Sequence, residues 1–229
     1  MSLHLFPDVE QGTEEWHALR RGIVTASIMG QLVTAKTLKV AANDTSRGLT
    51  AALVAERITG YTEPTYQSDD MLRGTLSEPI ARDLYSDHYQ TAGQTGFMIR
   101  DDWGFKIGYS PDGLVGDDGL LEIKSPRQKT HLATILADEV PLEHMAQIQC
   151  GLLVSGRKWL DFISYCGGMP LFVKRVLPDE KWHEAIIEAV KAFEQNAALM
   201  MANYKDATEG MPSTERIDFF ADMETSPWT

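Results

Sequence analysis

The chain has 229 residues, of which 43% are hydrophobic and 24% are charged. These proportions are typical of ordinary globular proteins and exclude extensive disorder and collagen-like repetition. No apolar run approaches the roughly 18 residues of a membrane-spanning helix, and two cysteines, Cys150 and Cys166, are too few for a disulfide framework. We therefore expect a cytoplasmic protein without a membrane partner, with both cysteines serving as small core residues.

The formal net charge of −12 argues against nucleic acid as a partner, because phosphate binding usually accompanies an excess of Lys and Arg. The acidity is uneven, however. Residues 179–229 carry a balance of −7, whereas the much longer segment 1–178 carries −5 and contains 17 basic residues. A basic groove within an acidic exterior therefore remains compatible with the composition.

Helices are expected in the first 90 residues. Thr13 is suited to cap a short helix that Gly22 ends, and Gly60 is suited to end a later one. Pro79 falls in the first turn of another, where its missing N–H has little effect. The expected helices cover residues 13–20, a segment that starts near Thr25 or Ser27, residues 46–59 and about residues 77–89.

Short strands separated by Asp/Gly turns are expected next, at residues 97–99, 104–109, 114–115 and 120–124. A helix over 142–154 that ends at Gly156, two strands over 159–165 and 171–177, and a helix over about 180–204 complete the pattern.

The expected fold class is α/β (α+β), with a central mixed β-sheet flanked by helices. We expect one domain over 1–229, with a core of about 14–205 and a C-terminal tail, 206–229, whose Phe219, Phe220 and Trp228 dock on a surface.

The segments Gly108–Gly113 and Leu120–Lys124 hold the residues with chemical potential. Side chains alternate along a strand, so Glu122 and Lys124 share one face and Ile123 points to the other. A three-residue turn of 117–119, with Gly119 left-handed, would pair Gly116 with Leu120, Leu114 with Glu122 and Asp112 with Lys124. We favour this turn, which puts Asp112 on the face of Glu122 and Lys124; a two-residue turn would set Asp112 opposite Ile123 unless a bulge intervened.

Two carboxylates that converge on one point repel each other, and a divalent cation between them relieves the repulsion. Oxygen ligands favour Mg²⁺, with Mn²⁺ as a substitute. Lys124 would then orient or deprotonate an attacking water and offset charge on a phosphate. Asp112, Glu122 and Lys124 thus predict phosphodiester hydrolysis, although a solvated strand face is the competing interpretation of Glu122 and Lys124.

This pattern resembles the PD-(D/E)xK superfamily, whose fold is a restriction-endonuclease-like nuclease core, and its flanks resemble the lambda exonuclease branch of viral recombination nucleases. The resemblance covers roughly residues 14–165 and weakens beyond Cys166. Its blocks are residues 16–27 (WHALRRGIVTAS), 73–78 (RGTLSE), 110–113 (SPDG) with 122–124 (EIK), and 145–149 (MAQIQ).

The resemblance implies further site residues. Arg20 and Ser27, with Thr25, would bind the 5′ phosphate of a DNA end. Glu78, in the first turn of its helix, would support the metal site directly or through water. The backbone carbonyl of Ile123 would be a further ligand, and two ions are expected.

Other positions match the family less closely. Gln147 would position the catalytic lysine and water. His144 lies on the same helical face but stands where an aromatic residue is expected. Leu72, after Met71, would part the strands as a wedge. Lys36, Lys39 and Arg47 would grip the duplex backbone, against the simpler interpretation of a solvated basic face.

The implied activity is Mg²⁺-dependent 5′-to-3′ degradation of one strand of linear duplex DNA to mononucleotides, which leaves a 3′ single strand for recombination by annealing. The implied partners are 5′-phosphorylated DNA ends, two further copies in a homotrimeric ring and a single-strand annealing protein. The implied location is the cytoplasm of a bacterium or a phage-infected host. The alternatives are a structure-specific or restriction-type endonuclease on the same core and a non-catalytic DNA-end scaffold.

Overall fold

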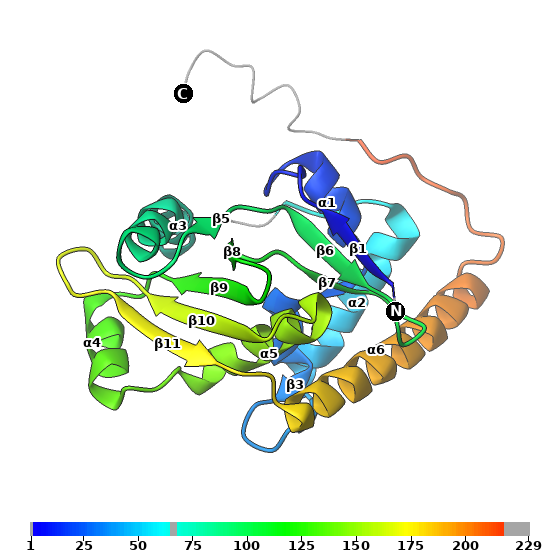
Figure 1. Cartoon of the computed structure of the whole chain (residues 1–229). Helices are drawn as coiled ribbons and strands as arrows, with labels where there is room; N and C mark the ends of the chain where they lie inside the picture. Colours follow the sequence, from blue (N-terminus) through cyan, green and yellow to red (C-terminus); the bar gives the residue numbers. More distant parts are fainter. Residues whose placement is uncertain (1, 65–67, 218–229) are drawn as a thin grey trace, which may run out of the picture.

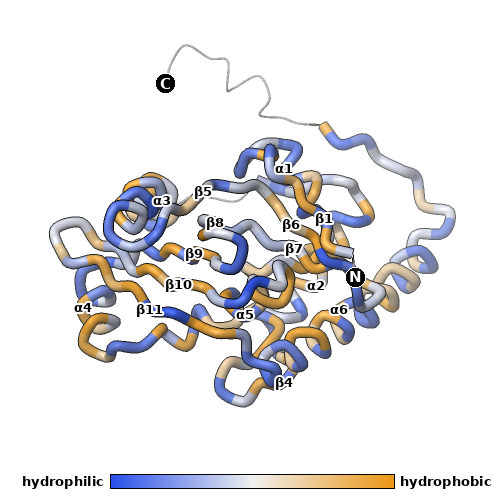
Figure 2. Tube along the Cα trace, in the orientation of Figure 1, coloured by the Kyte–Doolittle hydropathy of each residue, from blue (hydrophilic) through white to orange (hydrophobic). Residues whose placement is uncertain are grey.

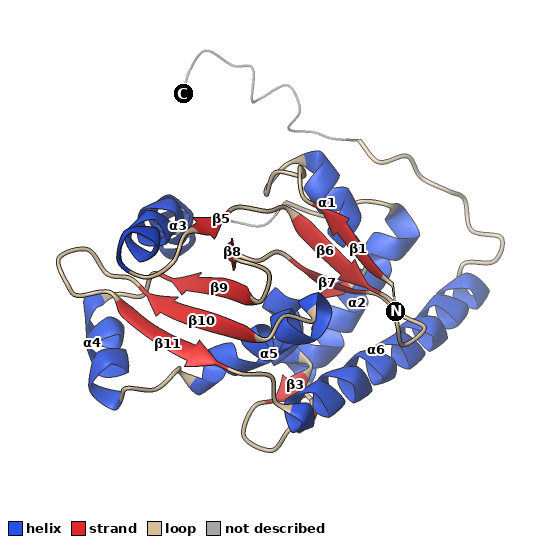
Figure 3. Cartoon of the chain, in the orientation of Figure 1, coloured by secondary structure: helices blue, strands red, loops and turns tan. Residues whose placement is uncertain are grey.

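The computed structural model describes residues 2–64 and 68–217, which form two mixed β-sheets with helices packed around them (Figures 1 and 3). The tail residues Phe219, Phe220 and Trp228 lie outside the described residues. The strands of the first sheet, in spatial order, are β1 (Leu3–Phe6), β6 (Phe97–Arg100), β7 (Ile107–Tyr109) and β2 (Val24–Thr25). Those of the second are β11 (Phe172–Val176), β10 (Trp159–Ser164), β9 (Gly119–Lys124), β8 (Gly113–Val115) and β5 (Ala92–Gly93).

The helices of the described chain are α1 (Glu14–Arg20), α2 (Asp44–Thr59), α3 (Asp69–His88), α4 (Gln128–Ala137), α5 (Leu142–Ser155) and α6 (Glu180–Ala207). A 3₁₀ helix, η1 (Ala26–Gln31), and a small hairpin of β3 (Val33–Thr34) with β4 (Lys39–Val40) lie between β2 and α2. No helix in the described part of the chain combines the length and apolarity needed to cross a membrane.

The two faces of the five-stranded sheet belong to two cores. On one face, Leu120 and Phe162 join a large core with α5 and α6, to which α6 contributes Ile186, Val190 and Phe193 at helical spacing. On the other face, the strands pack against α3 in a smaller core made of Ala81, Tyr85, Val115, Leu121, Ile123 and Ile163. Figure 2 shows the apolar segments running through α5, β9 and β10 in the interior. Side chains on alternate positions of β9 therefore meet different layers, as the alternation predicted.

The expected α/β class with a mixed sheet and flanking helices is confirmed, but the strands divide into two sheets. The division falls after β7, where Ser110, Pro111 and Asp112 separate it from β8. Proline has no N–H to donate to a ladder, so it interrupts pairing. The pairing of β9 with β10 is parallel, whereas β8 with β9 and β10 with β11 are antiparallel. β1 was not predicted; it pairs with β6, so the packed structure begins before residue 14.

The turn between β8 and β9 differs from the favoured one. It consists of Gly116, Asp117 and Asp118, and it places Leu114 opposite Leu120. Gly116 takes the left-handed conformation (φ 51°), so the expected role of Gly119 and the expected pairing of Leu114 with Glu122 were wrong. The pairing is shifted by two residues, and a shift of two keeps every side chain on its face. Asp112 therefore still lies on the side of Glu122.

The expected start of α3 was also wrong, since the helix begins at Asp69 and Pro79 lies inside it. Ser68 caps this start by accepting a hydrogen bond from the backbone N–H of Met71 at 3.2 Å. Glu78 is consequently in the middle of the helix instead of its first turn. The helix expected near Thr25 or Ser27 is the 3₁₀ helix η1, and Cys166 is only half-buried, whereas Cys150 is fully buried in α5 as expected.

Candidate active site

The β8–β9 hairpin and α5 bring the predicted catalytic residues to one cavity of about 850 Å³. Asp112 immediately precedes β8, Glu122 and Lys124 lie on β9, and Gln147 lies on α5. All four line the cavity, together with Glu78 from α3. The side chains that sequence spacing placed on one face are thus also close in space.

Glu122 is the most enclosed of these residues, with 0% of its surface exposed. Its Oε1 atom accepts a hydrogen bond from Gln147 Nε2 at 2.5 Å and lies 2.7 Å from Lys124 Nζ. Its Oε2 atom is buried and has no hydrogen-bond partner among the described residues. A buried carboxylate oxygen left unpaired is costly, so this atom points to a ligand that the chain itself does not provide.

Lys124 links Glu122 to α5. Its Nζ also donates to Gln147 Oε1 at 3.1 Å, so the amide of Gln147 contacts both the carboxylate of Glu122 and the ammonium of Lys124. Burial alone would lower the pKa of Lys124, but attraction to Glu122 and Asp112 outweighs it, and the net pKa is raised. Lys124 is therefore an ammonium at neutral pH, able to donate hydrogen bonds into the cavity.

Asp112 is held by the neighbouring strand and by α3. Its Oδ2 atom accepts the backbone N–H of Ile123 at 2.6 Å, and its backbone carbonyl accepts from Arg82 Nε at 2.6 Å. Burial, followed by repulsion from Glu122 and Glu78, raises the pKa of Asp112 well above its usual value. Burial also raises the pKa of Glu78, although the adjacent Arg82, which donates to it, opposes this shift. The carboxylates therefore destabilise one another when no cation lies between them.

These residues fit a hard divalent cation. The unpartnered Oε2 of Glu122 and the mutual repulsion of Asp112, Glu122 and Glu78 both call for positive charge in the cavity. In residues 2–64 and 68–217, no three acidic, histidine or cysteine side chains already enclose a point as a closed metal cage. Mg²⁺ usually takes one or two protein carboxylates and keeps its other positions for water and phosphate. Ile123 lines the same cavity, and its carbonyl as a ligand stays a prediction.

Arg20, Thr25 and Ser27 form a polar cluster at another wall of the cavity. Arg20 Nη2 lies 3.2 Å from Ser27 Oγ and 3.4 Å from Thr25 Oγ1, and the guanidinium stacks 3.9 Å from the centre of the Trp16 ring. Burial, partly offset by attraction to Glu56, lowers the pKa of Arg20 to about 10, which leaves it charged at neutral pH. Arg20 and Ser27 line the cavity directly, and Thr25 lies behind them.

His144 also lines the cavity, one turn before Gln147. Its ring stacks on Phe162 with centres 5.5 Å apart. Burial, followed by repulsion from Lys124, lowers the pKa of His144 to about 4, so the ring is neutral at neutral pH. A neutral imidazole can accept or donate one hydrogen bond here, and its part in catalysis stays a prediction.

The remaining predicted residues do not line this cavity. Lys36 and Lys39 are exposed in and beside the β3–β4 hairpin, and Arg47 pairs with Asp44 at 2.5 Å on α2. Leu72 is 46% exposed in the first turn of α3, next to Met71, which does line the cavity. Contacts of these residues with a duplex would lie outside the cavity, and their roles stay predictions.

Several residues that line the cavity, or bond to residues that line it, were not predicted to have roles. Trp16 donates from Nε1 to Ser110 Oγ at 2.9 Å and supports Arg20, while Arg82 orients Asp112 and Glu78. Arg73 and Arg127 form a basic edge. Trp16, Ser110 and Arg73 lie inside the matching blocks and could have been singled out there. No sequence signal marks Arg127, because α4 was not predicted.

Solved structures share this architecture. An alkaline exonuclease (LHK-Exo) from Laribacter hongkongensis superposes with a TM-score of 0.77 at 33% identity over 87% of this chain and 100% of that chain. The same enzyme in complex with dAMP matches equally well. A phage-related exonuclease from Haemophilus somnus 129PT shares the fold, with a TM-score of 0.62 at 14% identity over 81% of this chain and 98% of that one. No curated protein sequence matches significantly.

The fold and its carboxylate-lined cavity define a nuclease of the alkaline exonuclease type. The model of the YqaJ-like viral recombinase domain matches residues 15–158, and the chain belongs to this family. The resemblance to viral recombination nucleases is thereby confirmed.

Proposed function

We propose that the chain is a Mg²⁺-dependent 5′-to-3′ exonuclease that degrades one strand of linear double-stranded DNA to mononucleotides and leaves a 3′ single strand for annealing. One observation carries the proposal: Asp112, Glu122 and Lys124 converge on one cavity that Arg20 and Ser27 also line. The activity named for the Laribacter protein, and its complex with a nucleotide, support the choice of substrate. The three residues are the PD-(D/E)xK set of this proposal.

In this proposal Asp112 and Glu122 hold Mg²⁺, or Mn²⁺ in its place, with Glu78 acting through water, the Ile123 carbonyl as a further ligand and two ions in all. The metal supplies Lewis acidity at the scissile phosphate. Lys124 donates hydrogen bonds to the attacking water or the phosphate, or accepts a proton from that water.

Gln147 is a positioning residue, because it fixes Glu122 and Lys124 relative to each other through its amide. Arg20, Ser27 and Thr25 bind the terminal 5′ phosphate through the guanidinium and hydroxyl donors of their cluster. Because the ring of Trp16 holds Arg20 from behind, little side-chain freedom is lost when the phosphate binds.

A homotrimeric ring and a single-strand annealing protein complete the proposal, on the basis of the resemblance to lambda-type exonucleases. A ring that encloses its duplex is retained by topology, so it does not require a basic exterior. That arrangement suits a chain with a net charge of −12. Lys36, Lys39 and Arg47 would contact the duplex backbone away from the cavity, and Leu72 would act as the wedge.

Digestion of linear duplexes labelled at either the 5′ or the 3′ end, with and without a 5′ phosphate, tests the polarity. We expect Mg²⁺-dependent release of the 5′ label first, faster from phosphorylated ends. Earlier loss of the 3′ label would overturn the direction, and cutting of a closed circular duplex would favour an endonuclease. Binding of DNA ends without any Mg²⁺-dependent release of nucleotides would favour the non-catalytic scaffold.

A further inference from the structure

A second groove, of about 650 Å³, adjoins the cavity between α3, the start of α4 and the loop after β10. We call it the basic groove; its lining includes Arg73, Ser125, Arg127, Lys129 and Tyr165. Arg73, Ser125 and Arg127 also line the cavity, so the two spaces share a wall. A linear polymer bound in the cavity can therefore extend into the groove.

The groove has an unusual charge for this protein. Its lining in the described structure contains the cations Arg73, Arg127 and Lys129 and no carboxylate, although the whole chain has a net charge of −12. The side chain of Arg127 is 73% exposed, and Lys129 is also exposed. Within residues 2–64 and 68–217, Lys129 forms no ion pair. A concave basic surface in an acidic protein attracts a polyanion specifically to that place.

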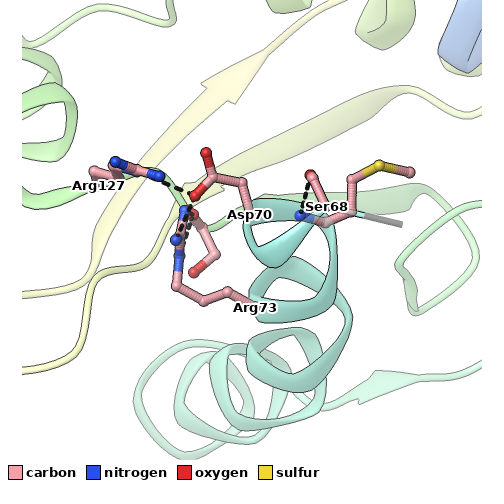
Figure 4. Close-up of polar contacts among 6 residues, drawn as sticks. Ser68, Asp70, Arg73 and Arg127 are labelled. Atoms are coloured by element: carbon pink, nitrogen blue, oxygen red, sulfur yellow. Dashed lines mark hydrogen bonds and ion pairs between the residues drawn. The ribbon is translucent and has the colours of Figure 1, made fainter. Parts of the chain in front are cut away.

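Asp70 contacts both Arg73 and Arg127 (Figure 4). Its Oδ1 atom accepts from Arg73 Nη1 at 2.7 Å and from Arg127 Nε at 3.1 Å. Arg73 is further fixed by donating from Nε and Nη2 to the Ser125 carbonyl, at 3.3 and 3.1 Å. Arg73 is thus a structural link, whereas the two terminal nitrogens of Arg127 have no partner among the described residues.

The groove lies across the cavity from the Arg20 cluster. In Figure 1, α1, which carries Arg20, and α4, which begins beside Arg127, are far apart, with β8 and β9 between them. The catalytic carboxylates occupy this intermediate position. If the 5′ phosphate binds at Arg20, the scissile phosphate lies at the carboxylates and the strand then continues toward α4.

We propose that the basic groove binds the phosphodiester backbone of the strand being degraded, on the 3′ side of the scissile bond, through Arg127 and Lys129. Asp70 is the positioning residue for Arg127. The inference rests on the proposed function and adds to it a binding site for the part of the strand that stays attached to the DNA. Such a site would hold the next phosphodiester in line for the following cleavage.

The test is a KM-against-kcat comparison at several salt concentrations for a variant with Arg127→Gln and Lys129→Gln. At about 0.15 M salt we expect KM for a 5′-phosphorylated duplex to rise about tenfold, with kcat within about twofold of wild type. Each lost phosphate contact reduces the slope of log(kcat/KM) against log[salt] by about 1, so a reduction of about 1 to 2 is expected.

A charge-matched control carries Lys158→Gln and Lys191→Gln. Lys158 precedes β10, whereas Ser164, at the other end of this six-residue strand, lines the cavity, and Lys191 lies on α6. Strands rise about 3.3 Å per residue, so Lys158 and Ser164 are about 20 Å apart along the strand. We expect this control to leave the salt slope unchanged. An equal reduction in both variants would mean a general charge effect and would overturn the inference.

Duplexes with methylphosphonate linkages, which are uncharged, identify the strand that the basic groove binds. Neutral linkages at the phosphates just 3′ of the first scissile bond, in the degraded strand, should raise KM for wild type but not raise it further for the Arg127/Lys129 variant. The assignment would be overturned if the methylphosphonates and the Arg127/Lys129 substitutions raised KM additively in the degraded strand. It would also be overturned if the two effects were non-additive only when the methylphosphonates lay in the complementary strand. A changed inhibition constant for a 5′-mononucleotide would instead identify a product site and would also overturn it. If wild type releases no nucleotides, the proposed function fails before any variant is compared.

Discussion

Asp112→Asn tests whether the cavity is built around a cation without relying on activity. The amide keeps an oxygen that can accept the Ile123 N–H, now at 2.6 Å, and it removes the charge that Glu122 and Glu78 repel. Without metal, the Tm of the variant should therefore be no lower than that of wild type. It should be higher if the loss of repulsion outweighs the altered hydrogen bonding. Removing one partner of a buried ion pair strongly destabilises a protein, so an unchanged or higher Tm is specific to a site of mutually repelling carboxylates.

Saturation with Mg²⁺ sets the size of the expected rise in Tm. At a concentration of about 100 Kd, binding to the folded state adds about 2.7 kcal/mol to the unfolding free energy. For about 150 to 250 residues, each kcal/mol shifts Tm by about 2 to 4 °C, so wild type should gain about 5 to 10 °C. Asp112→Asn should gain less than about 2 °C, as measured by differential scanning calorimetry. An equal gain in both proteins, or a metal-free variant that melts well below wild type, would refute the reasoning.

Three further predictions concern the same cavity. Without metal, the raised pKa values of Asp112 and Glu78 mean that the folded chain binds more protons than the unfolded chain above about pH 4. The unfolding free energy, measured by urea titration, should therefore fall as the pH rises from there, and Mg²⁺ should oppose the fall. Gln147→Leu removes the 2.5 Å hydrogen bond to Glu122, worth about 1.5 to 3 kcal/mol, so kcat should fall about 10- to 100-fold while KM changes little; an unchanged kcat would exclude a positioning role. Arg20→Lys removes the planar fork beside Ser27, so the rate advantage of 5′-phosphorylated over 5′-hydroxyl ends should fall about tenfold in parallel digestions; equal loss on both ends would contradict phosphate binding.

Local patterns predicted the parts of the site that lie on one hairpin. The alternation of Glu122, Ile123 and Lys124 depends only on strand geometry, and it survived a turn placed differently from the favoured one. Gly116 and Gly119 both flank the Asp117–Asp118 pair, and either could supply a left-handed residue. The choice depends on packing of the whole sheet, but the two alternatives with a three-residue turn put Asp112 on the same face.

Contacts between distant segments were beyond the reach of local patterns. α3 was expected to start near residue 77, yet it begins eight residues earlier because Ser68 caps it and Arg73 bonds to Ser125, 52 residues away. The basic groove could not be predicted for the same reason, because its residues come from α3, α4 and the loop after β10. The division into two sheets likewise follows from tertiary pairing, of β7 with β6 and β2 and of β8 with β9 and β5, which no single segment specifies.

The most direct test of the central claim compares wild type with Glu122→Gln on a linear, 5′-phosphorylated, uniformly labelled duplex in Mg²⁺. Glutamine keeps the shape of Glu122 and an acceptor for Gln147, but it removes the charge beside Lys124 and the unpartnered carboxylate oxygen. We predict steady release of mononucleotides by wild type and a loss of at least about a thousandfold in the variant, about 4 kcal/mol of transition-state stabilisation, with its thermal unfolding still cooperative. Release by the variant at a rate near that of wild type would contradict the account.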